Sequence, residues 1–109
     1  MDLMEELERK LRILNASVKE LSKTGKDYAK AYTDYRVALA KELVKLKDGG
    51  MPVTIAYDVA RGNPEIARLK FEEIAKEAVY KANQETINVY KLQIKIIQEQ
   101  INKEYNSYE

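Results

Sequence analysis

Acidic side chains offer the first candidate chemistry in this sequence, because Glu72, Glu73 and Glu77 stand close together. Neighbouring carboxylates can hold metal ions or transfer protons, and in helical di-iron proteins they occur in Glu-x-x-His motifs. The chain has no histidine and no cysteine, so the commonest general base, the commonest metal ligand and every thiol nucleophile are missing. Each glutamate also has a lysine within one helical turn. We therefore expect surface charges here, and we expect no catalytic residue, no metal and no cofactor.

A glycine-rich phosphate loop is also missing from the sequence. Gly49-Gly50 leads into Met51-Pro52, whereas a phosphate loop leads into Lys-Ser or Lys-Thr. A chain with these omissions is typical of proteins that bind other molecules without transforming them. The sequence therefore predicts a non-enzymatic protein.

Lysine residues form a second candidate site. Those at positions 19, 23, 26 and 30 follow each other at intervals of three or four residues, so on a helix they occupy one face. Such a ridge could bind nucleic-acid phosphates, although the net charge is only +1 and no aromatic residue lies between the lysines. A solvated helix face is the alternative. Two lysines of the second helix are expected beside the ridge, so the predicted lysine ridge consists of Lys19, Lys23, Lys26, Lys30, Lys91 and Lys95.

Three of the eight tyrosines, Tyr28, Tyr32 and Tyr35, also share one helical face. They continue the apolar spacing of Leu21 and lead into Leu39, which favours core positions from which each hydroxyl reaches a partner or the edge of a bundle. The alternative is an exposed platform on which nucleic-acid bases or a partner protein stack.

These candidate residues are positioned by a long first helix that we predict over residues 2–48. Steps of three and four residues from Met4 reach apolar or aromatic side chains at almost every position, which is a sustained heptad pattern. Asp2 and Glu5 have the spacing of an N-terminal capping box. Gly25 weakens the helix without changing the heptad phase. The predicted seam includes Met4, Leu7, Leu11, Leu14, Val18, Leu21, Tyr28, Tyr32, Tyr35 and Leu39.

A corner over residues 49–63 separates this helix from a second long one. It begins with Gly49-Gly50-Met51-Pro52, the strongest helix breaker in the chain. Residues 53–61 can form two helical turns that end at Gly62, which we expect in the left-handed conformation. An extended conformation of residues 53–55 is the alternative. Asn63 as N-cap and Pro64 in the first turn then open a helix over residues 64–105.

The nearly equal lengths of the two helices predict an all-α fold, an antiparallel coiled-coil hairpin with a short helical corner. With the corner at its centre, Leu11 faces Ile101 and Val18 faces Ile94. The second helix carries one apolar stripe for this seam and another that has no partner within the chain. We therefore expect two hairpins to form a homodimer, an elongated four-helix bundle. The seam stripe is Ile66, Leu69, Tyr80, Ile87, Tyr90, Ile94, Ile97 and Ile101, and the predicted oligomer interface contains Phe71, Ile74, Val89, Leu92 and Ile96.

The corner is unusually apolar for a connection between two helices. One hypothesis is a cap that closes the end of the bundle. The other is a partner-binding tip with Tyr57 and Arg61 as contact residues, because both residue types are frequent in binding hot spots. We favour a combination, in which Ile55 and Val59 point inward while Tyr57 and Arg61 point outward.

Residues 50–104 resemble a group of small uncharacterised helical proteins that phages and prophages of Gram-positive bacteria encode. The shared motifs are Gly50-Met51-Pro52, Gly62-Asn63-Pro64-Glu65, Phe71-Glu72, Ala78-Val79-Tyr80-Lys81-Ala82, Lys91-Leu92-Gln93-Ile94 and Gln100-Ile101. These motifs are structural, and the first helix is similar to the group only in its heptad pattern. The resemblance implies a phage accessory protein and transfers no site residues.

Two classes of function remain. The first is a phage-type interaction protein that binds a host protein, for example as an inhibitor of a nuclease or of a defence system. The second is a DNA-binding accessory of phage recombination or replication that uses the lysine ridge. The acidic start lacks the features of a signal peptide, and no stretch approaches the ~20 apolar residues of a membrane span. We therefore expect a protein of the host cytoplasm that does not enter the membrane.

Overall fold

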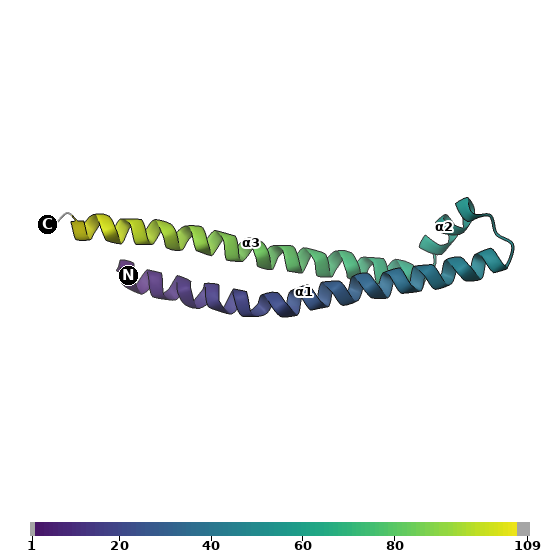
Figure 1. The fold of residues 1–109 in the computed structure, drawn as a ribbon, viewed down its shortest axis with the longest axis horizontal. Helices are drawn as coiled ribbons and strands as arrows, with labels where there is room; N and C mark the ends of the chain where they lie inside the picture. The colour runs from purple at the N-terminus through teal and green to yellow at the C-terminus, as the bar shows by residue number, and fades with distance from the viewer. Residues whose placement is uncertain (1, 107–109) are drawn as a thin grey trace. The chain divides into compact units, whose positions relative to one another are not determined.

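The computed structural model describes residues 2–106, most of which lie in three helices. α1 covers Leu3–Asp48, α2 covers Val53–Arg61 and α3 covers Pro64–Asn106, and no strand occurs among these residues (Figure 1). The predicted all-α class, with two long helices and a short helical corner, is confirmed. α1 is continuous through Gly25. None of the helices within residues 2–106 contains an apolar segment long enough to cross a membrane.

Capping residues define where both long helices begin. The Asp2 carboxylate accepts a hydrogen bond of 2.8 Å from the backbone N–H of Glu5. At the start of α3, the side-chain oxygen of Asn63 accepts from the N–H groups of Glu65 and Ile66, at 2.9 and 3.4 Å. These N–H groups have no carbonyl partner within a helix, so the side-chain oxygens satisfy donors that would otherwise depend on water.

Gly50, and not Gly62, supplies the left-handed conformation at the corner. Its φ angle is 88°, in the region that glycine adopts without strain. The N–H of Gly50 donates to the carbonyl of Lys47 and the N–H of Met51 donates to that of Leu46, which is the Schellman arrangement. Gly62 has a φ of −81° and a ψ of −8°, so the predicted left-handed cap at Gly62 is wrong. The reason is that α3 begins almost at once, and right-handed backbone leads directly into it.

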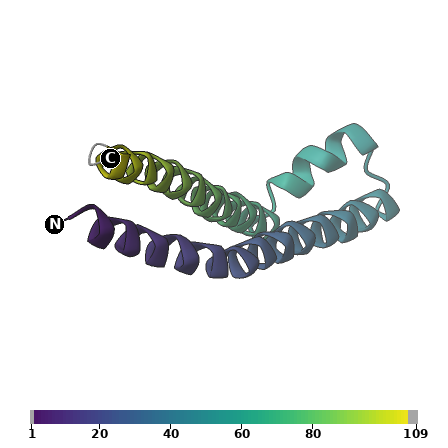
Figure 2. The same ribbon diagram turned by 60° about the vertical axis from the view of Figure 1, so that its left-hand side comes forward.

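Contacts divide the described chain into two compact units. The terminal unit contains residues 2–23 and 80–106, and the corner unit contains Thr24–Val79. In each unit a segment of α1 lies antiparallel beside a segment of α3, and in the corner unit α2 lies beside the last turns of α1 (Figures 1 and 2). In the terminal unit, Lys10 Nζ donates to Gln93 Oε1 at 2.8 Å and Asn83 Nδ2 donates to the Ser17 carbonyl at 3.0 Å.

The register of this antiparallel pairing differs from the predicted one by about three helical turns. Lys10 lies opposite Gln93, where the predicted register places residue 102. The predicted pairing of Leu11 with Ile101 is therefore wrong. The reason lies in the corner unit, where the last turns of α1 pair with α2 (Figure 2). Because α2 occupies that position, α3 begins beside an earlier part of α1.

The seam that α3 presents is confirmed, whereas the seam of α1 is partly wrong. Members of the α3 seam stripe in both units are buried, as at Ile66 and Ile94. On α1, however, the predicted seam residues Leu11 and Val18 are exposed, while Ala31 is buried. Small side chains allow two helices to approach closely, so the contact includes positions that the apolar pattern does not mark.

Candidate interaction site

α2 is held in the corner unit by two alanines. Ala56 and Ala60 have 0% of their surface exposed, whereas Ile55 and Val59 are 53% and 44% exposed. Residues four apart on a helix face the same way, and the small size of alanine lets α2 pack closely. The prediction that Ile55 and Val59 point inward is therefore wrong. The apolar pattern marks the larger side chains, but the close approach of α2 requires the smaller ones.

Tyr57 and Arg61, the candidate contact residues of the tip, are both exposed. The guanidinium carbon of Arg61 lies over the Tyr57 ring, 5.4 Å from the ring centroid. Tyr57 also forms one side of a groove in the corner unit. The α1 residues that line this groove, which we call the α1–α2 groove, are Tyr35, Arg36, Leu39, Ala40 and Leu43. Its lining is therefore mostly apolar, with a single cation at Arg36.

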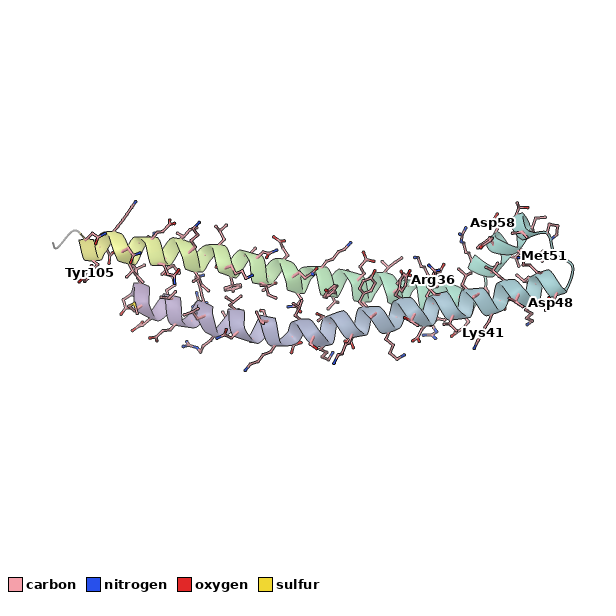
Figure 3. The ribbon with its side chains drawn as sticks, viewed as in Figure 1. Arg36, Lys41, Asp48, Met51, Asp58 and Tyr105 are labelled. Atoms are coloured by element: carbon pink, nitrogen blue, oxygen red, sulfur yellow. The ribbon has the colours of Figure 1, made fainter. Side chains whose placement is uncertain are left out.

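Arg36 belongs to a second tyrosine–arginine pair, on α1. Its guanidinium carbon is 5.7 Å from the centroid of the Tyr32 ring, and its Nη1 donates to the Tyr32 hydroxyl at 3.1 Å. Figure 3 labels Arg36 on α1, and the side chain is exposed. Tyr32 is also exposed, although the heptad pattern favours a core position for it. The two pairs thus lie on α1 and α2 and share the α1–α2 groove through Arg36 and Tyr57.

The three tyrosines of α1 occupy different environments. Tyr35 is buried, Tyr28 is half-buried and Tyr32 is exposed. The rings of Tyr28 and Tyr32 meet edge to face, with centroids 6.4 Å apart. This geometry is neither the uniform core layer that the heptad pattern favours nor the flat stacking platform that was its alternative.

An ion pair beside Tyr35 involves Glu73, which is only 6% exposed. Glu73 Oε2 lies 3.0 Å from Lys70 Nζ, and the same ammonium lies 4.8 Å from the centroid of the Tyr35 ring. The expectation that Glu73 is a surface charge is wrong, because it falls seven residues after Ile66 on the seam of α3. The hydrogen bond to Glu73 is the main cause that raises the pKa of Lys70, against the opposing effect of burial. No group of acidic side chains in the described ranges is arranged to hold a metal ion.

Arg61 and Lys70 line a second groove in the corner unit, together with Tyr35, Ile66 and Ala67. Because Tyr35 lines both grooves, they are neighbours. Sequence reasoning found Arg61 but missed Arg36 and Lys70. Spacing could have indicated Arg36, since a tyrosine four residues before an arginine brings ring and guanidinium together on a helix.

An exposed ion pair at the start of α3 differs from these tyrosine–arginine pairs. Arg68 Nη2 and Nε lie 2.6 and 3.0 Å from the two carboxylate oxygens of Glu65, which is bidentate geometry. The hydrogen bond from Arg68 is the main cause that lowers the pKa of Glu65, and it also raises the pKa of Arg68. The charge of Arg68 is thus satisfied within the chain.

The predicted oligomer interface is exposed in both units. Phe71 and Ile74 of the corner unit are 68% and 57% exposed, and Val89, Leu92 and Ile96 of the terminal unit are exposed as well. Apolar side chains that recur on one helix at such spacing usually mark an interface.

All six lysines of the predicted ridge are exposed. In the terminal unit Lys10 contacts Gln93, so Lys91 lies near the level of residue 10. Lys91 also lines a pocket that includes Leu21, two residues from Lys19. The grouping of Lys91 and Lys95 with Lys19 therefore stays a prediction.

Comparisons with protein-family models, with curated proteins and with solved structures found no match.

Proposed function

We propose that this chain is a non-enzymatic interaction protein that binds another protein through the exposed side of α2. The observation that carries the proposal is the way α2 is attached. Two alanines face inward, and the larger side chains of Ile55 and Val59 face solvent beside Tyr57. A helix that merely closed the end of a hairpin would bury its largest apolar residues, because their burial contributes most to stability. Exposed apolar and aromatic side chains on a small helix are typical of a binding surface.

The resemblance of residues 50–104 to phage and prophage proteins supports a host protein as the partner. In this proposal the chain acts in the host cytoplasm, as an inhibitor of a nuclease or of a defence system. Two of the motifs that carry the resemblance, Gly50-Met51-Pro52 and Gly62-Asn63-Pro64, directly flank α2.

We further propose that two copies associate through the exposed apolar stripe of α3. The stripe includes Phe71 and Leu92, whose side chains α1 and α2 leave largely uncovered. Sedimentation equilibrium at micromolar concentration tests the assembly. We expect twice the chain mass of 12.6 kDa, shifted towards the monomer by Leu92→Glu. A wild-type monomer would contradict the dimer and leave the role of α2 untouched.

Site-specific photo-crosslinking in bacterial cells tests the role of α2. A photoreactive amino acid replaces Ile55 in one variant and Val59 in a second, and a third carries it at Lys26, an exposed position on α1. We expect one protein adduct that forms at both α2 positions and not at the control position. The captured protein must then bind the purified chain, and Tyr57→Ala combined with Arg61→Ala must weaken that binding. If the α2 positions give no adduct beyond the control, the interaction surface lies elsewhere.

Exposed lysines on α1 support a second candidate function, DNA binding. Lys19 and Lys26 are solvated and have no carboxylate partner among the described residues, although Lys30 pairs with Asp34 at 2.6 Å. If this surface binds DNA, affinity should fall steeply with salt, and replacing the lysines at 19, 23, 26 and 30 by glutamine should abolish it. Absence of any mobility shift at low salt, with single- and double-stranded DNA, would exclude this function.

A further inference from the structure

The tyrosine–arginine face of the corner unit, defined as Tyr32, Arg36, Tyr57 and Arg61, carries two guanidinium groups without a counter-ion. No carboxylate within residues 2–106 forms an ion pair with Arg36 or Arg61. Arg68, by contrast, has a bidentate partner on its own helix. Both guanidinium groups belong to the corner unit. Arg36 lines the α1–α2 groove, and Arg61 lines the second groove, which shares Tyr35 with the first.

Each guanidinium is held in place by an aromatic ring. Arg36 lies 5.7 Å from the Tyr32 centroid and Arg61 lies 5.4 Å from the Tyr57 centroid. A cation over a ring keeps its charge and most of its N–H donors, since the ring interacts with the face of the group. Only one donor of Arg36 is used, in the hydrogen bond to the Tyr32 hydroxyl. Both arginines therefore retain donors for a bidentate acceptor such as a carboxylate.

The α1–α2 groove beside these cations is apolar. Leu39, Ala40 and Leu43 contribute aliphatic surface, Tyr57 contributes an aromatic side, and Arg36 is the only charged residue of the lining. An apolar side chain of a partner can enter this groove while neighbouring carboxylates reach the two arginines. A nucleic acid brings phosphates for the arginines but no aliphatic side chain for the groove.

From this charge and shape complementarity we propose that the tyrosine–arginine face binds an acidic segment of a partner protein, with acidic residues on both sides of an apolar one. The proposal rests on the proposed function, since it specifies the chemistry of the protein that the α2 region binds. The apolar residue enters the α1–α2 groove, and the flanking carboxylates bind Arg36 and Arg61.

The test uses a displayed library of short random peptides selected on the full chain. We expect enriched peptides to carry acidic residues around a leucine or an aromatic residue. Synthetic versions are then titrated by fluorescence anisotropy, and their Gln/Asn analogues should bind at least about tenfold more weakly, the effect of losing one charge-assisted hydrogen bond. Arg36→Gln combined with Arg61→Gln should have the same effect on the acidic peptides.

Arg9→Gln combined with Arg12→Gln is the matched control, because it removes the same charge from exposed arginines of the terminal unit. The control should change affinity by less than about twofold if the contact is local. Should the glutamine pair at positions 36 and 61 fail to fold, lysines at both positions keep the charge and should still weaken binding, since lysine cannot replace bidentate contacts.

Three results would overturn the inference: no enriched peptide, enriched peptides without acidic residues, or equal loss in the control variant. Binding of an oligothymidylate that depends on Arg36 and Arg61, with no acidic peptide bound, would also overturn it and would identify the face as a nucleic-acid site. None of these results would remove crosslinks formed at Ile55, so failure here is distinguishable from failure of the proposed function.

Discussion

Replacing Ala56 by leucine should detach α2 from the corner unit. Ala56 has 0% of its surface exposed, so the three added carbon atoms of leucine have no room unless α2 moves outward. Overpacking at a closely packed site costs about 1–3 kcal/mol in the free energy of unfolding. At roughly 4 °C per kcal/mol for a chain of this size, the melting temperature should fall by roughly 4–12 °C.

Two control substitutions separate close packing from other effects of the change. Ile55→Ala removes a larger apolar side chain, but that side chain is half exposed, so the expected loss is below about 0.5 kcal/mol. Ala29→Leu places the same leucine at an exposed position of α1 and should be nearly neutral. Ala56→Leu should therefore be less stable than Ile55→Ala. A helix that buried its large residues would give the opposite order.

Urea denaturation followed by circular dichroism gives the global free energy of unfolding for each variant. Because α2 has only nine residues, hydrogen–deuterium exchange of peptides that cover residues 53–61 is the more direct measurement of docking. Exchange there should be faster in Ala56→Leu and unchanged in both controls. If Ala56→Leu has no effect while Ile55→Ala costs more than about 1 kcal/mol, α2 packs through its other side and not through the alanines.

Three further predictions concern the ends of α1 and α3 and the buried ion pair. In urea denaturation Gly50→Ala should lower the free energy of unfolding by about 1–2 kcal/mol because the φ of Gly50 is 88°. Gly62→Ala should be neutral or slightly stabilising because the φ of Gly62 is −81°. Equal effects would contradict the assignment of the left-handed cap to Gly50. Asn63→Ala should lower the free energy of unfolding by about 1 kcal/mol, and an unchanged value would mean that the N-cap hydrogen bonds contribute nothing. Lys70→Met should cost about 1–3 kcal/mol at neutral pH because it leaves the buried Glu73 carboxylate without a donor. The folded state raises the pKa of Lys70, so its stabilisation is fully present below the unfolded pKa of ~10.4 and is lost as the pH rises through the raised pKa. The difference in unfolding free energy between wild type and Lys70→Met should therefore narrow as the pH rises beyond ~10.4, and a constant difference would be inconsistent with this linkage.

Helix boundaries could be predicted from the sequence because they depend on local chemistry. Asp2 and Asn63 cap helices through bonds to residues two or three positions away, and the break after Asp48 follows from two glycines and a proline. The seam of α3 could also be predicted from the sequence, since isoleucines such as Ile94 recur at heptad spacing. Each of these features involves neighbours within one or two helical turns.

The register could not be predicted, because it depends on where α2 packs. A hairpin with a simple corner places Lys10 near residue 102, but docking of α2 on the end of α1 shifts that partner to Gln93. The docking itself rests on Ala56 and Ala60, which an apolar pattern based on large side chains does not distinguish from solvent-facing alanines.

Only part of the candidate site could be predicted from the sequence, for the same reason. Tyr57 and Arg61 were found by residue type and by their place in the corner. Arg36 lies far from them in the sequence and reaches the α1–α2 groove only because α2 folds back towards α1. Glu73 was misjudged because acidic side chains with a nearby lysine are usually solvated, whereas this one lies on the seam beside Tyr35.

The attachment of α2 by alanines also has an evolutionary consequence. The residues that hold the helix, Ala56 and Ala60, are not those that it displays, such as Ile55, Tyr57 and Val59. Substitutions on the displayed side should therefore cost little stability, because solvated positions tolerate most residues. If α2 binds a partner as proposed, relatives of this chain can adapt to changes in that partner through substitutions at those positions while both alanines are kept. Such adaptation predicts that, among relatives, residues 55, 57 and 59 vary rapidly while residues 56 and 60 remain small.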